Sequence, residues 1–227
     1  MKKKSILGII PAREGSKGLP RKNKLLLNGK PLIAWTIEEA IKSKKINKLI
    51  VSTNDEEIIS IANDYGCETP FKRPENISTD KSSAYQVISH SLKAFPRFER
   101  FIYLQPTSPL RICKDIDSCI NYMDINNSKS IVSVSKPKIS PHLIYKLKDK
   151  KKIQPLIKSK KIINNRQNYP DYYYINGSIY VANTNWYIKR KTFISSETIS
   201  YIMPQDRSVD IDTIEDFIIA DYYLSKR

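Results

Sequence analysis

The chain has 227 residues and a formal net charge of +16. This length fits one domain, or one domain with an appendage, and a composition of 40 % hydrophobic and 27 % charged residues is typical of a folded globular protein. No apolar run approaches the roughly 20 residues of a membrane span, and the stretch after the first lysines is too short for a secretory signal, so we expect a cytoplasmic protein. Three cysteines without a C-x-x-C pair, and two histidines, disfavour a disulfide framework and a zinc site.

Apolar runs and helical periods alternate through the first 134 residues. Residues 5–10 form a short apolar run that ends at Pro11, which is typical of a buried parallel strand. Further strands are expected at 48–53, 101–104 and 130–134, with helices opening at Pro31 and covering 55–65, 82–95 and 115–123. This order predicts a Rossmann-like α/β fold, in which a mainly parallel sheet lies between two layers of helices. Ligands in such sheets bind at the carboxyl ends of the strands.

The rhythm breaks between residues 135 and 174. This segment contains four prolines and no long helical period, and residues 136–161 contain ten lysines against one acidic residue. We interpret 135–174 as an inserted β-rich arm with a hairpin tip at 150–152. The α/β pattern resumes with strands at 175–182 and 200–203 and a helix at 213–224, so the main domain is predicted to comprise 1–134 and 175–227.

The net charge also permits a different class of protein. Clustered cations beside the three tyrosines at 172–174 could bind a single-stranded nucleic acid. Because so much of the excess charge lies in one arm, a solvated charge run is an equally physical explanation. We therefore expect no nucleic-acid partner and keep nucleic-acid binding as the alternative.

The loop 11–23 (PAREGSKGLPRKN) is the most informative segment. Its two glycines allow a tight backbone whose N–H groups can face an anion. Arg13, Lys17, Arg21 and Lys22 follow directly on the first predicted strand, and backbone donors, a hydroxyl and several cations suit a polyphosphate. The loop has neither a Gly-Lys-Ser/Thr sequence nor the G-x-G-x-x-G pattern. We predict phosphate binding here, with a solvated basic turn as the alternative.

A second candidate site is the pair Asp210 and Asp212 in SVDIDT. In an extended segment both carboxylates point to the same side, with Cα atoms about 6.6 Å apart. Mg²⁺ commonly takes one or two protein carboxylates and completes its shell with water and phosphate oxygens. One aspartate could instead cap the following helix, although Thr213 and Asp216 provide another cap pair.

These segments together resemble the acylneuraminate cytidylyltransferases, the CMP-sialic acid synthetases. The resemblance rests on IIPAREGSKGLPRKN (9–23), IVSTNDEEI (50–58), RPENISTD (73–80), LQPTSPLR (104–111), INGSIYVA (175–182) and SVDIDTIEDF (208–217). It covers nearly the whole chain and implies a nucleotidyltransferase fold, a homodimer formed through the arm 135–174, and no membrane or nucleic-acid partner.

The reaction implied by the resemblance is CTP + N-acylneuraminate → CMP-N-acylneuraminate + diphosphate, with Mg²⁺ as cofactor. Catalysis would fall to Arg13, Lys17, Lys22 and Asp212, and Mg²⁺ would be held by Asp210 and Asp212. The residues implied for nucleotide binding are Arg13, Ser16, Lys17, Lys22, Asn23, Arg73, Ser82 and Ser83. Those implied for sugar binding are Gln105, Arg166, Asn176 and Tyr180.

The chain departs from the family pattern at three places. The family usually has an Arg-Pro or similar pair before N-G-A-I-Y, where this chain has Tyr174 and Ile175, and a lysine early in the arm, where residues 141–143 read PHL. The usual A-S-S reads Ser-Ser-Ala at 82–84. Since the first two departures lie near the expected sugar site, legionaminic acid or another nonulosonic acid is an alternative acceptor.

Overall fold

The computed structural model describes residues 4–15, 18–157 and 170–227. The described strands are β1 (Ile6–Pro11), β2 (Leu26–Leu27), β3 (Lys30–Pro31), β4 (Lys48–Ser52), β5 (Arg100–Tyr103), β6 (Ser130–Ser135), β7 (Tyr145–Lys148), β8 (Lys152–Pro155), β9 (Tyr174–Asn183) and β10 (Ile199–Ile202). The described α-helices are α1 (Leu32–Ile41), α2 (Glu56–Asp64), α3 (Ala84–Ala94), α4 (Cys113–Ile125), α5 (Thr184–Arg190) and α6 (Ile214–Ser225). Short 3₁₀ turns occur at η1 (Lys22–Lys24), η2 (Glu75–Ile77), η3 (Pro141–Leu143) and η5 (Gln205–Arg207).

Six strands form the central sheet in the order β10-β6-β9-β5-β1-β4. Strand β1 is parallel to β4 and β5, and β6 is parallel to β10, whereas β9 is antiparallel to both of its neighbours, β5 and β6. The predicted mainly parallel α/β sheet is therefore confirmed, with β9 as its reversed strand.

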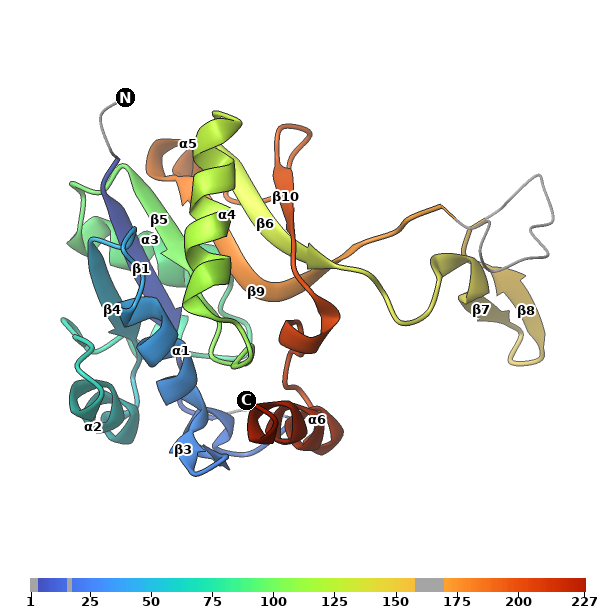
Figure 1. Ribbon diagram of the computed structural model, residues 1–227, viewed down its shortest axis with the longest axis horizontal. Coiled ribbons are helices and arrows are strands. Elements are labelled where there is room, and N and C mark those ends of the chain that lie inside the picture. The colour runs from blue at the N-terminus through green and yellow to red at the C-terminus, as the bar shows by residue number, and fades with distance from the viewer. Residues whose placement is uncertain (1–3, 16–17, 158–169) are drawn as a thin grey trace.

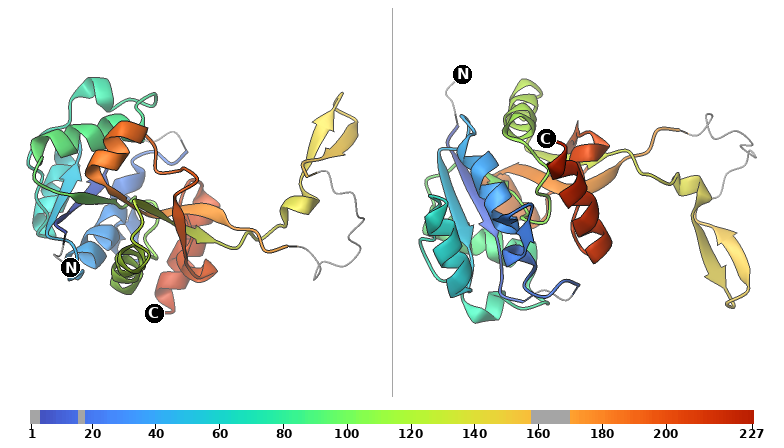
Figure 2. Two further views of the ribbon diagram at one scale, coloured as in Figure 1. Left: turned by 90° about the horizontal axis from the view of Figure 1, so that it is seen from above. Right: turned by 60° about the horizontal axis from the view of Figure 1, so that its bottom comes forward.

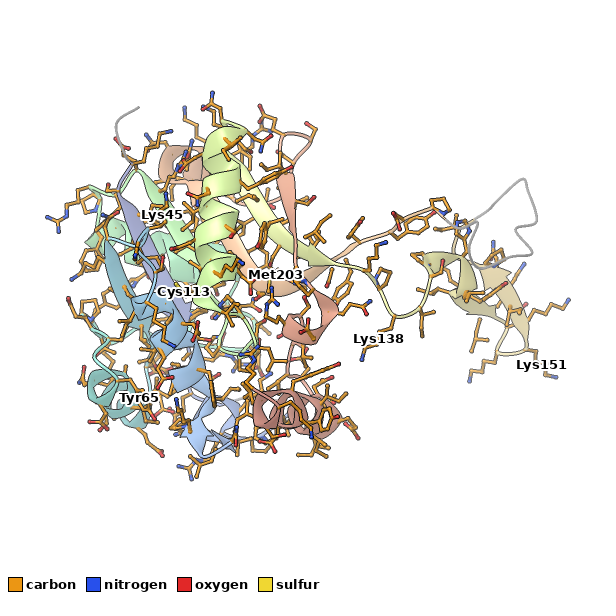
Figure 3. All side chains as sticks on the ribbon, viewed as in Figure 1. Lys45, Tyr65, Cys113, Lys138, Lys151 and Met203 are labelled. Atoms are coloured by element: carbon orange, nitrogen blue, oxygen red, sulfur yellow. The ribbon has the colours of Figure 1, made fainter. Side chains whose placement is uncertain are left out.

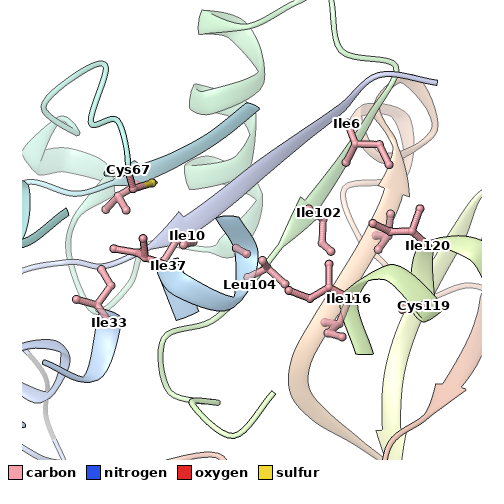
Figure 4. Close-up of a cluster of buried hydrophobic side chains, with 14 of the residues drawn as sticks. Ile6, Ile10, Ile33, Ile37, Cys67, Ile102, Leu104, Ile116, Cys119 and Ile120 are labelled. Atoms are coloured by element: carbon pink, nitrogen blue, oxygen red, sulfur yellow. The ribbon is translucent and has the colours of Figure 1, made fainter. Parts of the chain in front are cut away.

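Helices cover both faces of this sheet (Figure 1). On one face, Ile37 of α1 and Ile120 of α4 pack in a fully buried cluster with Ile10 and Ile102 of the strands, as the close-up in Figure 4 shows. Helices α3 and α5 cover the other face, where Tyr187 is enclosed among aromatic side chains. The result is the expected three-layer arrangement.

Local sequence signals explain where most helices begin and end. The carboxylate of Asp55 accepts hydrogen bonds from the first backbone N–H groups of α2, and Gly66 follows that helix at φ 72°. Capping boxes start α3 at Ser83 and α6 at Thr213, the latter with Asp216 as its partner. Several details differ from the sequence-based expectations. Helix α1 begins at Leu32, one residue after Pro31, α4 begins at Cys113 and not at 115, and α5 was not predicted at all.

The described residues between β6 and β9, 136–157 and 170–173, extend away from the body (Figures 1 and 2). This segment leaves at Ser135 and returns at Tyr174, which are paired in the sheet. Its described part contains the antiparallel hairpin β7–β8, whose loop joins Lys148 to Lys152 and whose strand residues are all exposed. Lys151 lies at the far end of this hairpin (Figure 3). Within the described ranges, no helix has the length and apolar character needed to cross a membrane.

Candidate active site

A cavity of about 550 Å³ opens at the carboxyl ends of β1 and β5. Its walls come from the loop after β1, the segment between β4 and α3, the turn after β5, and the segment before α6. The lining residues are Pro11, Arg13, Gly18, Lys22, Asn23, Arg73, Ile77, Thr79, Asp80, Ser82, Ala84, Val87, Tyr103, Gln105, Pro106, Thr107, Asp210 and Asp212. The cationic loop near the amino terminus and the paired aspartates near the carboxyl terminus therefore face one cavity.

Direct contacts join these two distant segments. The Nζ atom of Lys22 donates to the carbonyl oxygen of Ile211 at 2.7 Å and to Oδ1 of Asp212 at 2.9 Å. Gly18 lies so close to the carbonyl oxygen of Asp212 that an added Cβ would overlap it. The glycine is required by close backbone approach, and the lysine supplies the electrostatic link.

The two aspartates have different surroundings. Asp212 keeps 75 % of its side-chain surface exposed, whereas Oδ1 of Asp210 is buried and has no hydrogen-bond partner among the described residues. Burial raises the pKa of Asp210, and nearby Asp212 adds to the increase, while the Thr107 side chain and Lys22 oppose it. A buried carboxylate oxygen without a partner is unusual in a folded protein and points to a ligand for it.

Gly177 of β9 brings the metal candidate and the sugar candidate together. Its φ is +75°, and an added Cβ would lie 2.8 Å from Oδ2 of Asp210 and 3.2 Å from Oε1 of Gln105. Any larger residue at this position would push on both side chains. The N-G pair in β9 thus sets how closely Gln105 and Asp210 approach the strand.

Arg13 and Arg73 also line the cavity. Nη2 of Arg13 forms an ion pair with Asp80 at 2.5 Å. Arg73 is buried, its Nε donates to Oγ of Ser78 at 2.9 Å, and its Nη2 has no partner among the described residues. Burial lowers the pKa of Arg73, and the neighbouring charge of Arg13 acts in the same direction. An unused guanidinium donor facing a cavity suits recognition of an oxygen-rich ligand.

Not every predicted nucleotide residue lines this cavity. Asn23 and Ser82 do, but Ser83 is absent from the lining and its hydroxyl accepts from the Gln86 backbone N–H at the start of α3. Arg21 was expected beside the other cations, but its guanidinium pairs with Glu57, and it lines a neighbouring hollow of about 440 Å³. Ser16, Lys17 and Arg166 lie outside the described residues.

Of the described residues predicted to bind the sugar, only Gln105 lines the cavity. Gln105 lines the cavity, whereas the buried side chain of Asn176 is engaged with the hydroxyls of Ser133 and Ser208. Tyr180 packs its ring 4.9 Å from that of Phe193, and burial raises the pKa of its hydroxyl. Neither Asn176 nor Tyr180 is among the described residues that line this cavity, and their roles as sugar contacts stay predictions.

Sequence reasoning missed several residues near the site. Tyr103 and Thr107 line the cavity on either side of Gln105, and their position at the end of a predicted strand was the available signal. Arg111, fully buried behind the same turn, gave no signal of its own because an arginine after a Pro-rich turn is ordinarily expected at the surface.

The donor set fits a divalent cation bound partly by phosphate. Within the described ranges, no group of three or more His, Cys, Asp or Glu side chains could hold a metal ion. Mg²⁺ needs fewer, since one or two carboxylates with phosphate oxygens and water complete its shell. The buried, unpartnered Oδ1 of Asp210 and the exposed carboxylate of Asp212 match that requirement.

Curated proteins are similar in sequence to this chain along nearly its whole length. An N-acylneuraminate cytidylyltransferase from Escherichia coli O18:K1:H7 is 38 % identical over 218 residues, covering 95 % of this chain and 51 % of that protein. A CMP-N,N'-diacetyllegionaminic acid synthase from Legionella pneumophila is 35 % identical over 223 residues, covering 95 % of this chain and 94 % of that protein. The chain thus spans about half the length of the first curated relatives it matches.

Solved structures support the fold. The structure of a CMP:2-keto-3-deoxy-manno-octonic acid synthetase complexed with CTP superposes with a TM-score of 0.71 at 17 % identity, covering 98 % of this chain and 99 % of that one. The 4-diphosphocytidyl-2C-methyl-D-erythritol synthase of Anaerococcus prevotii gives a TM-score of 0.69 at 16 % identity, covering 99 % and 100 %. A family model described as cytidylyltransferase matches residues 7–225, and the chain belongs to this family.

Proposed function

We propose that this protein activates a nine-carbon 2-keto sugar acid by the reaction CTP + N-acylneuraminate → CMP-N-acylneuraminate + diphosphate. The single observation that carries the proposal is the cavity shared by the cationic loop after β1 and the Asp210–Asp212 pair. Two relatives at 38 % and 35 % identity, an N-acylneuraminate cytidylyltransferase and a CMP-legionaminic acid synthase, support the same class of reaction.

In this proposal the loop 11–23 holds the triphosphate of CTP. Arg13 and Lys22 face the cavity, and Ser16 and Lys17 complete the predicted set. The anomeric hydroxyl oxygen forms a bond to the α-phosphorus while the bond to the diphosphate oxygen breaks, and the loop cations neutralise the charge of the leaving diphosphate. Asp212 is the candidate acceptor of the hydroxyl proton because its carboxylate is exposed at the cavity.

Asp210 and Asp212 would hold Mg²⁺. When bound, Mg²⁺ polarises the α-phosphate as a Lewis acid. Gln105 would bind sugar hydroxyls from the turn after β5, and Arg73 and Asn23 would bind the ribose or the base. Arg166 is proposed to pair with the sugar carboxylate, since a guanidinium fork matches that group.

We propose a homodimer formed through the arm 135–174, with residues 1–134 and 175–227 as the catalytic domain. An isolated two-stranded hairpin is marginally stable in water, yet this one projects from the body with every strand residue exposed. Its exposed apolar residues include Ile139, Leu143, Ile144, Tyr145, Leu147, Ile153 and Leu156. A second copy of the chain would bury these side chains.

The proposed location is the cytoplasm. Cys67, Cys113 and Cys119 are all free thiols, which agrees with a reducing compartment.

The test is release of diphosphate from CTP with N-acetylneuraminic, legionaminic, pseudaminic and 3-deoxy-manno-octulosonic acids, with and without Mg²⁺. We expect CTP-dependent release with one nonulosonic acid, and its identity selects between N-acylneuraminate and legionaminic acid as the acceptor. Salt-sensitive binding of oligonucleotides, with no diphosphate release from any acid, would instead support the nucleic-acid alternative.

Replacing Arg166 by Ala should raise the KM for the sugar acid much more than the KM for CTP. Equal increases would remove Arg166 from carboxylate recognition.

A further inference from the structure

Arg111 is a buried cation that joins three elements behind the active-site cavity. Its Nη1 donates to the carbonyl oxygen of Ser178 in β9 at 2.6 Å, and its Nη2 donates to Oγ1 of Thr36 in α1 at 2.8 Å. Both nitrogens also approach the carbonyl oxygen of Gln105, at 3.4 and 3.5 Å. Arg111 is 1 % exposed, and its hydrogen bonds to Ser178 and Thr36 are buried.

Packing alone does not explain a charge at this position. No carboxylate among the described residues forms an ion pair with Arg111, and its Nε has no partner there. Burial lowers the pKa of Arg111 to about 10, with Asp115, Glu39 and Asp210 opposing the decrease from a distance. An apolar side chain of similar volume would avoid this cost of desolvation, whereas a guanidinium fork can hold several carbonyl groups at fixed angles.

The carbonyl of Ser178 belongs to a bulge in β9. Val132 of β6 pairs with Tyr180 of β9, and Val134 pairs with Ile175. An advance of two residues along β6 therefore corresponds to five residues along β9. Bulges of this kind redirect a strand beside a functional site. The extra residues include Gly177, which lies against the side chains of Asp210 and Gln105.

The bulge is held from two directions. The hydroxyl of Ser133 and the hydroxyl of Ser208 engage the side chain of Asn176 on the β6 side. Arg111 holds Ser178 from the α1 side, and the same guanidinium reaches the backbone of Gln105. Arg111 therefore donates hydrogen bonds both to the bulge and to the backbone of Gln105.

We propose that Arg111 is a positioning residue that clamps the β9 bulge to the turn after β5 and thereby sets the arrangement of Gln105 and Asp210 around Gly177. Its effect on the sugar acid rests on the proposed function, because Gln105 is the residue proposed to bind that substrate. The clamp itself is a statement about the fold and is measurable without substrate.

The experiment compares Arg111→Lys with Arg100→Lys as a matched control. Arg100 is also a buried arginine, but it lies at the start of β5, at the end of that strand away from Gln105. There it pairs with Asp124 and Asn183. Hydrogen–deuterium exchange is measured in peptides covering 104–108 and 174–180. We expect exchange in both peptides to rise by about tenfold in Arg111→Lys, the scale of losing one hydrogen bond to a charged group, and to match the wild type in Arg100→Lys.

Kinetics provide the second readout. In Arg111→Lys the KM for the sugar acid should rise about tenfold while the KM for CTP stays within about twofold, because Arg111 contacts the Gln105 backbone directly and affects Asp210 only through Gly177. Unchanged exchange in both peptides, or equal increases in the two KM values, would overturn the clamp.

If the wild-type protein releases no diphosphate with any acid, the proposed function fails and exchange alone decides on Arg111. If Arg111→Lys does not fold, Thr36→Val removes one acceptor at constant shape and should raise exchange in the same peptides to a smaller degree.

Discussion

Replacing Gly177 by alanine separates backbone strain from disruption of the site, because Gly66 offers a matched control. Gly177 and Gly66 have φ values of +75° and +72°. An L-residue in this left-handed region costs about 1–2 kcal/mol. For a chain of this length, each variant should therefore lose roughly 2–8 °C in Tm.

The two sites differ in what the new Cβ meets. At Gly66 nothing lies within 4 Å, whereas at Gly177 the Cβ would be 2.8 Å from Oδ2 of Asp210, about 0.6 Å short of an ordinary 3.4 Å contact. The carboxylate must move by that order. Because a misplacement on the ångström scale in an active site costs about 10²-fold, kcat/KM should fall by about 10²-fold in Gly177→Ala and by no more than about twofold in Gly66→Ala.

Thermal unfolding and diphosphate release, measured on both variants under the same conditions, provide the comparison. Similar losses of Tm with a large difference in kcat/KM would support the placement of Asp210 at the reacting groups. Equal activities in the two variants would refute it, since the clash at Gly177 would then have no consequence for the reaction.

Three further variants test other parts of the structure. Lys22→Met removes the ammonium that bridges the Ile211 carbonyl and Asp212, and should lower kcat/KM about 10²-fold in the diphosphate assay; retained activity would remove Lys22 from the site. The pKa of Asp55 is lowered in the folded protein, because the opposing effect of burial is outweighed by Lys24 and the α2 backbone N–H groups. Asp55 therefore stabilises the fold above its unfolded pKa of about 4, and this contribution is lost as the pH falls through its folded pKa. The difference in unfolding free energy between wild type and Asp55→Asn should therefore shrink below about pH 4, and a constant difference from pH 7 to 3 would contradict this. Leu147→Asp in the hairpin should convert a dimer to a monomer in light scattering at micromolar concentration, and a monomeric wild type would exclude the arm interface.

The sequence was sufficient for the strands and helices whose signals are local. Apolar runs located β1, β4 and β5, helical periodicity located α2, and the Thr213–Asp216 pair marked the start of α6, because these signals depend on neighbouring residues. The reversed direction of β9 was not predicted, since an apolar run has the same pattern in either direction. Helix α5 was missed because it has seven residues and follows β9 without a linker.

The candidate site divides in the same way. The loop after β1 and the aspartate pair were visible as clusters of residue types, and their juxtaposition was expected from the family resemblance. The supporting contacts were not visible, because they join residues far apart in sequence. Arg111 meets Ser178 across 67 positions, and the role of Gly177 depends on a bulge set by pairing with β6. Asn176 and Ser83 remain predictions as ligand contacts, although the structure gives both a structural hydrogen bond.

The total charge of +16 is a poor guide to how the cavity would recognise an anion. Among the described residues that line it, Arg13, Lys22 and Arg73 stand beside the three carboxylates of Asp80, Asp210 and Asp212, so this described part of the lining has no excess of positive charge. Arg13 already pairs with Asp80, and Lys22 with Asp212. A triphosphate would therefore exchange with existing carboxylate partners instead of adding to bare cations. Such exchange releases few counterions, so the affinity for CTP should depend on salt much less steeply than the net charge suggests. A steep dependence would place the binding charge in the lysine-rich arm instead.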